Sequence, residues 1–385
     1  MSKLRRLPLA RWLVPLVAAL VFIGGGSAVA AIATAGRHAP APPPVDQLLA
    51  DVAHARVDGL SGTIVQDTNL GLPQLPGVGG DAHSSDLQSL VSGSHTLRVW
   101  YAGPKHVRLS LLGHLGESDV IRNGQDLWVW SSSNRTAVHR VLPDKATRQG
   151  KAHQKAQEMG HGTAPLEAMT PQGAARMLLR KVDPTTKVTT GPDTTVAGRP
   201  AWQLVVTPRS HTTLVGSIRV AIDTATHLPL QVQVFARGAS APAFDAGYTS
   251  FDPTTPSMSV FGFNPPAGTK VKQETGPLLG DLLGHGPGMA QHQPSQRMQS
   301  GRAPAPKLVG SGWDTVVIAQ APQAGLQKAG GQLGAMLKTL PEVSGPWGSG
   351  HLLQGTLFSV LLTDSGQVVA GAVPPAQLYA ALGQQ

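Results

Sequence analysis

The sequence contains no cysteine. This absence excludes disulfide bonds, thiolate metal sites and a lipid-modified cysteine at the N-terminus. Aromatic residues make up only 4% and charged residues only 14% of the 385-residue chain, whereas 45 glycines and 32 prolines are present. A chain with few charges and many turn-forming residues is expected to form few long helices. We therefore expect a β-rich protein that is held together by its apolar core alone.

Positive charge is concentrated at the N-terminus. Lys3, Arg5, Arg6, Arg11 and Arg37 precede the first acidic residue and supply five charges of the formal net charge of +9. A nucleic-acid surface needs a dense basic face with interleaved aromatic residues, which the rest of the chain lacks. The sequence therefore predicts no nucleic-acid partner.

The N-terminal segment has the pattern of an export signal. Trp12 to Gly36 carries no charge and follows four basic residues, and Ala28-Val29-Ala30 has the small-x-small form of a cleavage site. The segment is either removed after about Ala30 or kept as a membrane anchor with its positive end in the cytoplasm. Both alternatives place the body of the protein at the extracytoplasmic face of the membrane or in the cell envelope. Residues 37–44 then form a Pro-rich spacer.

The stretch from Thr96 to Leu142 predicts an antiparallel meander. Its apolar residues alternate with polar ones in twos, which is typical of half-buried strands. Asn123-Gly124 is a strong signal for a hairpin turn between two of these strands. Trp128 and Trp130 fall on the face opposite Leu127 and Val129, where they form either an exposed partner surface or a site covered by a neighbouring loop.

Further strands and two helices are expected around this meander. The helices are Val45 to Ala55 and Thr170 to Val182, each with an apolar stripe at helical spacing. The additional strands are Leu60–Asn69, Thr195–Val196, Ala201–Thr207, Ser217–Asp223, Leu230–Ala236, Tyr248–Phe251 and Met258–Phe263. A total of about ten or eleven strands is too many for a flat open sheet.

Two segments rich in glycine and proline interrupt the pattern. Gly71 to Gly93 is a long loop, either a lid or a disordered insertion. Residues 276–307 form a linker, so we expect a first domain over residues 45–275 and a small α+β domain over residues 308–385. The second domain is expected to contain strands at Trp313–Ala319, Leu357–Thr363 and Val368–Val373, and helices at Leu326–Leu340 and Pro375–Leu382.

No catalytic constellation is present in the sequence. Neither His-Glu-x-x-His nor Gly-x-Ser-x-Gly occurs, and His153, Glu158 and His161 are interpreted as surface residues rather than metal ligands. We therefore expect no enzymatic activity, no cofactor and no metal.

The motifs near the end of the first domain resemble a known family. Val220-Ala221-Ile222-Asp223, then Leu228-Pro229-Leu230, and later Phe261-Gly262-Phe263-Asn264-Pro265-Pro266-Ala267-Gly268 are similar to the LolA/RseB superfamily of envelope proteins. The resemblance covers about Val45 to Lys272. It implies a strongly curved antiparallel half-barrel that is plugged by helices and leaves an apolar cavity for acyl chains or lipoproteins. With so few aromatic residues, this cavity is expected to be aliphatic.

The inward-facing apolar residues are the candidate ligand contacts, unless they are simply core. They are Leu97, Val99, Tyr101, Val107, Leu109, Leu111, Leu127, Val129, Ile218, Val220, Ile222, Val232 and Val234. The function expected from the resemblance is a LolA-like carrier that binds a lipid, an acyl chain or a lipoprotein. The alternative is an RseB-like sensor that controls a sigma factor through an anti-sigma protein. A third hypothesis, a secreted hydrolase, is supported only by the predicted export of the protein.

Overall fold

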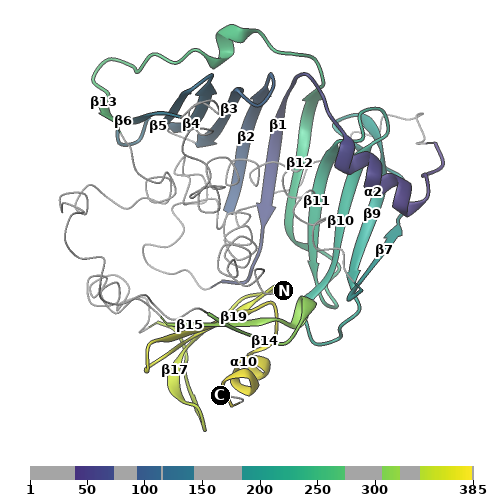
Figure 1. Cartoon of the computed structure of the whole chain (residues 1–385), viewed down its shortest axis with the longest axis vertical. Helices are drawn as coiled ribbons and strands as arrows, with labels where there is room; N and C mark the ends of the chain where they lie inside the picture. Colours follow the sequence, from purple (N-terminus) through teal and green to yellow (C-terminus); the bar gives the residue numbers. More distant parts are fainter. Residues whose placement is uncertain are drawn as a thin grey trace, which may run out of the picture.

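The computed structural model describes residues 40–72, 93–113, 116–142, 184–273, 306–320 and 339–383. Several predicted features lie outside these residues: the N-terminal segment 1–36, most of the Gly71–Gly93 loop, the helices at 170–182 and 326–338, the histidines at 153 and 161, and most of the linker. Where the structure is described, the protein is mainly β and consists of a 13-stranded sheet and a six-stranded sheet (Figure 1).

The large sheet has the order β13-β6-β5-β4-β3-β2-β1-β12-β11-β10-β9-β7, with β8 paired to β9. All of its strand pairs are antiparallel except β13 with β6, so the sheet is mixed. The strands are β1 (Leu60–Thr68), β2 (Gly93–Tyr101), β3 (His106–Gly113), β4 (Gly116–Asn123), β5 (Asp126–Ser131), β6 (Thr136–Val141), β7 (Thr186–Thr190), β8 (Thr194–Val196), β9 (Arg199–Pro208), β10 (Val215–Asp223), β11 (Pro229–Ala236), β12 (Pro242–Asp252) and β13 (Lys270–Gln273).

The predicted meander is confirmed as β2 to β6. Neighbouring strands pair in sequence order, and Gly124 has a φ of 64°, which the tight turn after Asn123 requires and which glycine adopts without strain. The period-two alternation therefore located both the strands and the sides to which their residues point.

The prediction for the end of the large sheet is partly wrong. Met258–Phe263 was expected to be a strand, but Met258–Phe261 forms the 3-10 helix η2, which the side chain of Ser257 caps by accepting from the Ser259 N–H. Strands β7 and β13 were not predicted, because neither shows apolar alternation. The sheet therefore has 13 strands rather than ten or eleven.

The smaller sheet has the order β14-β15-β19-β18-β17-β16, and all its pairs are antiparallel. Its strands are β14 (Lys307–Val309), β15 (Val316–Gln320), β16 (Glu342–Gly345), β17 (Gly348–Gln354), β18 (Ser359–Thr363) and β19 (Gln367–Gly371). The predicted strand at Trp313 begins only at Val316, after the 3-10 helix η3 (Gly312–Asp314), and β14, β16 and β17 were missed.

Each sheet carries one helix of the described part. Helix α2 (Val45–His54) lies across the β9–β11 end of the large sheet (Figure 1), and the prediction for it is confirmed. Helix α10 (Pro375–Gly383) packs on the smaller sheet with Leu378 and Leu382. In the described ranges, neither helix has the length and apolar character that crossing a membrane demands.

Candidate functional site

The predicted ligand residues lie on one side of the large sheet, which we call the apolar face. In register, Val99 lies opposite Leu109, Leu109 opposite Val120, and Val120 opposite Val129. A second row runs from Val220 through Val232 and Ala246 to Gln66 in β1. Residues opposite each other in a sheet point to the same side, and those two apart along a strand do as well. Ile64 lies two residues before Gln66 and opposite Leu97 of β2, and Leu97 lies two residues before Val99. The two rows are therefore on the same side of the sheet.

The β9–β11 half of the apolar face is filled by other parts of the chain. Ile218, Val220, Ile222 and Val232 are buried in one apolar cluster, against which Val234 packs. The cluster also contains Leu48 and Val52 of α2. These predicted ligand residues therefore belong to the core in this structure, which is the simpler of the two interpretations of the pattern.

The β2–β5 half of the apolar face holds the other predicted residues. Leu97, Val99, Leu109 and Leu111 are buried together, and Tyr101 packs against them. Leu127 is buried, whereas Val107 and Val129 are partly exposed. Of the two helices in the described ranges, α2 packs on the other half and α10 on the smaller sheet. Apart from Tyr101, Val107 and Val129, the predicted residues of this half are therefore buried like most of those of the β9–β11 half.

Two polar residues lie in the middle of the apolar face, and sequence reasoning assigned them no role. Gln66 of β1 is 5% exposed and lies opposite His95 of β2, which is 1% exposed. The sequence predicted a strand over Leu60–Asn69, which contains Gln66. No sequence signal indicated that an amide would be buried there, because glutamine is usually exposed.

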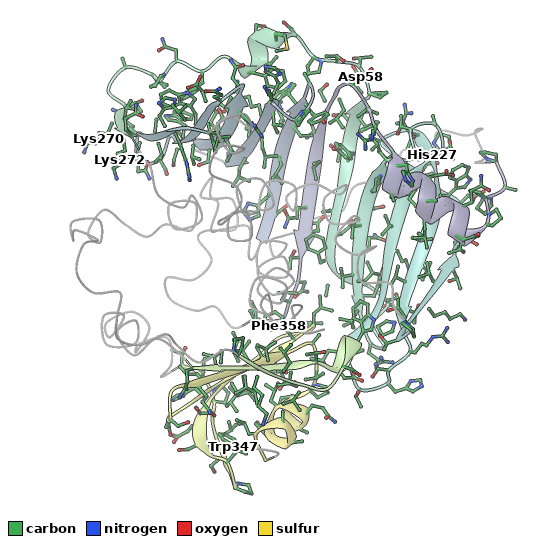
Figure 2. The ribbon with its side chains drawn as sticks, viewed as in Figure 1. Asp58, His227, Lys270, Lys272, Trp347 and Phe358 are labelled. Atoms are coloured by element: carbon green, nitrogen blue, oxygen red, sulfur yellow. The ribbon has the colours of Figure 1, made fainter. Side chains whose placement is uncertain are left out.

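The opposite side of the sheet is covered near β3 to β6 by the segment that follows β12. The ring of Phe263 lies 5.3 Å from that of Trp128 and 6.2 Å from that of Trp130. Trp128 also stacks on His139, with 4.1 Å between ring centres. Of the two alternatives for the tryptophans, cover from a neighbouring segment is therefore correct. The same segment ends in β13, whose Lys270 and Lys272 lie at the outer edge of the sheet (Figure 2).

The smaller sheet contacts the large one through apolar side chains. Phe358, which points toward the large sheet (Figure 2), packs with Leu70 and Ala243. Leu357 and Trp313 pack against the same cluster that buries Val220 and Val232 of the apolar face. The smaller sheet is therefore in contact with the β9–β11 half of the apolar face.

Hydrogen bonds join the two sheets at both ends of this contact. The Ala372 carbonyl accepts from the Leu214 N–H at 2.8 Å and from the Thr213 hydroxyl at 2.7 Å. At the other end, the Thr356 N–H donates to the Leu70 carbonyl at 2.6 Å. The indole N–H of Trp313 donates to the Thr186 hydroxyl at 2.9 Å. We call these bonds and the apolar contacts of Leu357, Phe358 and Trp313 the inter-sheet contact.

Two aspartates of the large sheet have pKa values shifted by their surroundings. Burial acts to raise the pKa of Asp223, but hydrogen bonds from Arg199 and Thr226, together with the Arg199 charge, outweigh it and hold the pKa below its usual value. Burial raises the pKa of Asp245, although Gln233 and Gln231 donate hydrogen bonds to it. Within the described residues, no three His, Asp or Glu side chains are grouped so as to hold a metal ion.

Comparison with known proteins finds similarity in structure only. No protein-family model matches the chain, and no curated protein matches it. The chain is similar to MucB in the crystal structure of MucB in complex with MucA(peri), with 15% identity, 88% of this chain and 97% of that chain covered, and a TM-score of 0.40. For the MucA/MucB complex of Pseudomonas aeruginosa, the identity is 15%, the coverage 88% and 95%, and the TM-score 0.39. A LolA superfamily protein from Nitrosomonas europaea matches 58% of this chain over 99% of its own, with 9% identity and a TM-score of 0.22.

Proposed function

We propose that the protein is an exported, non-enzymatic envelope regulator of the RseB-like type. It binds an apolar ligand on the large sheet and an anti-sigma factor as its protein partner. The observation that carries this proposal is that the smaller sheet packs on the same apolar cluster as predicted ligand residues, through Leu357 and Trp313. The β9–β11 half of the apolar face therefore contacts the smaller sheet, and Ile64 and Gln66 of β1 join this half to the β2–β5 half.

In this proposal the large and smaller sheets are two domains with separate roles. Residues 45–275 form a strongly curved half-barrel plugged by helices, and residues 308–385 form the second domain. Each has its own buried cluster, around Leu97 in the large sheet and around Leu361 in the smaller one. The segment 1–36 delivers the chain to the extracytoplasmic side, where both partners are found.

The ligand is a lipid or an acyl chain that lies along the β2–β5 half of the apolar face. Leu97, Leu109 and Val129 present aliphatic side chains there, and sites for apolar ligands are lined mainly by such residues with few polar groups. No described helix packs on this half. Val107 and Val129 of this half are partly exposed.

A LolA-like carrier of lipoproteins is the second candidate. It is favoured by the same aliphatic half of the face. A carrier needs only the large sheet, however, whereas this chain fastens a second sheet to it by hydrogen bonds and apolar packing. The inter-sheet contact therefore favours a regulator, which must pass a signal from ligand to partner.

The test is capture of the partner by the exported protein. Wild-type protein is incubated with solubilised membranes of the source bacterium, and bound proteins are identified by mass spectrometry. We expect an anti-sigma factor to be recovered, and we expect deletion of the gene to change expression of the genes controlled by the cognate sigma factor. Recovery of lipoproteins without any anti-sigma factor, together with unchanged expression, would support the carrier instead.

A matched pair of variants links the capture to the inter-sheet contact. Phe358→Ser removes an aromatic side chain from the side of the smaller sheet that faces the large one, and Trp347→Ser removes one from its far end (Figure 2). We expect Phe358→Ser to change capture of the anti-sigma factor more than Trp347→Ser. Equal effects would show that the inter-sheet contact plays no part in partner binding.

A further inference from the structure

Gln66 is a polar residue at the centre of an apolar surface. It belongs to β1, where Ile64 lies on the same side two residues before it, and it is flanked across the sheet by His95 and Ala246. Beyond Ala246 the same row continues with Val232 and Val220. Gln66 is 5% exposed, so its amide is shielded from water next to the buried His95 and Ala246.

The amide nitrogen of Gln66 is a buried donor without an acceptor. Its Nε2 atom has no hydrogen-bond partner. Nearly all buried polar groups in proteins are hydrogen-bonded, because an unbonded one has lost its water without gaining a replacement. A fully apolar residue would fit this surface at lower cost. The donor therefore needs an explanation that the folded chain alone does not give.

We propose that the Gln66 amide donates a hydrogen bond to the carbonyl group of a neutral acyl ester or amide that binds on the apolar face. This inference rests on the proposed binding of an apolar ligand and specifies its chemical class. A neutral amide donor satisfies a neutral carbonyl. It does not suit an isolated carboxylate or phosphate, whose burial requires a compensating charge.

The position of Gln66 fits one end of such a ligand. From β1, a row of aliphatic side chains extends through Leu97, Leu109 and Val120, which are buried, to the partly exposed Val129 in β5, which lies four strands away. At about 4.8 Å between neighbouring strands, this distance is roughly 19 Å, enough for a long extended acyl chain. The carbonyl then lies at Gln66 and the chain runs across β2 to β5.

The test compares two ligands that differ in the carbonyl group. Radiolabelled methyl palmitate carries an ester acceptor, and octadecane is an alkane of similar length without one. Each is delivered from a cyclodextrin complex to the full-length exported protein, and bound label is counted after gel filtration. The variant Gln66→Met keeps the length of the side chain and removes its donor, and Gln66→Leu is measured in parallel as a second apolar replacement.

The control variant is Gln203→Met. Gln203 lies opposite Ala221, one position away from the Leu204–Val220 row, and therefore points to the other side of the sheet. It is partly exposed, like most residues of that side. The same chemical change is thus made once inside the proposed site and once outside it.

We expect Gln66→Met and Gln66→Leu to bind methyl palmitate roughly tenfold more weakly than wild type, because one buried hydrogen bond is lost. Binding of octadecane should stay the same, and Gln203→Met should change neither ligand. The melting temperature of unliganded Gln66→Met should rise, because the unbonded donor is gone.

The inference is wrong if wild type binds both ligands but the Gln66 variants lose no preference for the ester. In that case a buried water satisfies the amide, while the proposed apolar-ligand function stands. If wild type binds neither ligand, the apolar-ligand function itself fails and the inference falls with it. The two failures are therefore distinguishable from the wild-type measurement alone.

Discussion

The ion pair between Arg199 and Asp223 is predicted to be a main source of stability at the β9–β10 end of the large sheet. The Arg199 Nε and Nη2 atoms donate to the two carboxylate oxygens of Asp223 at 2.8 Å and 2.9 Å. Asp223 is 0% exposed, and the guanidinium also lies 5.4 Å from the ring centre of Phe251. The perturbation is Arg199→Met, which keeps the apolar stem and removes the charge.

We expect Arg199→Met to lower the free energy of unfolding by about 3 kcal/mol at pH 7. Removing one partner of a buried ion pair costs roughly 3–5 kcal/mol, because the remaining charge is left uncompensated. The lower end applies here, since Thr226 still donates its N–H at 2.8 Å and its hydroxyl at 2.7 Å to the carboxylate.

The pH dependence follows from the pKa of Asp223. In the wild type this pKa is held below its usual value of 3.8. The ionised Asp223 therefore contributes to the free energy of unfolding above pH 3.8, and this contribution is lost as the pH falls through the folded-state pKa. Without Arg199, its hydrogen bonds and charge no longer counteract the effect of burial, so the pKa of Asp223 should rise. The carboxyl group then takes up a proton on mild acidification, so the variant should lose less stability at pH 4 than at pH 7.

Urea denaturation followed by circular dichroism at both pH values measures these differences. Arg219→Met is the matched control, because Arg219 is exposed, lies over the ring of Phe235 and forms no ion pair within the described part of the chain. Arg219→Met should lower the free energy of unfolding by about 1 kcal/mol or less. The reasoning is refuted if Arg199→Met costs no more than Arg219→Met, or if its cost is the same at both pH values.

Three smaller predictions concern other parts of the large sheet. Asp245→Asn should stabilise the protein by about 1 kcal/mol at pH 7 and not at pH 3. Burial raises the pKa of Asp245, so the folded protein becomes less stable as the pH rises and this carboxyl group must ionise. Urea titrations at the two pH values measure the difference. Ala197→Gly should raise the unfolding free energy by about 1 kcal/mol, since Ala197 has a φ of 52° next to Gly198, and thermal denaturation measures it. Phe263→Ala removes the cover from Trp128, so hydrogen exchange of the β13 amides should become faster, and unchanged exchange would show that the aromatic contact does not hold this strand.

The sequence was most informative where one side of a strand is buried. In β2 to β5 the alternation of Leu97, Val99, Leu109 and Val129 with polar residues predicted both the strands and the shared face, because burial on one side imposes a period of two. The same rule placed Ile218 and Val232 on that face, although they lie in a distant part of the chain.

Prediction failed where no such constraint acts. Strand β13 is an exposed edge strand with Lys270 and Lys272, and charged edges carry no apolar pattern. Met258–Phe263 was apolar enough to resemble a strand, but Phe261 and Phe263 pack their rings on the sheet instead of pairing their backbone with it. The unbonded amide of Gln66 could not be foreseen either, because it depends on how completely its surroundings exclude water.

The proposed regulator is tested most directly by measuring how ligand and partner influence each other's binding. The affinity of the exported protein for the captured anti-sigma factor is determined by calorimetry with and without saturating methyl palmitate. Because Leu357 and Trp313 contact the cluster of the apolar face, we predict that the ligand changes this affinity at least about fivefold, the lower range of allosteric coupling. Identical affinities with and without bound ligand would contradict the proposed link between the apolar face and the smaller sheet.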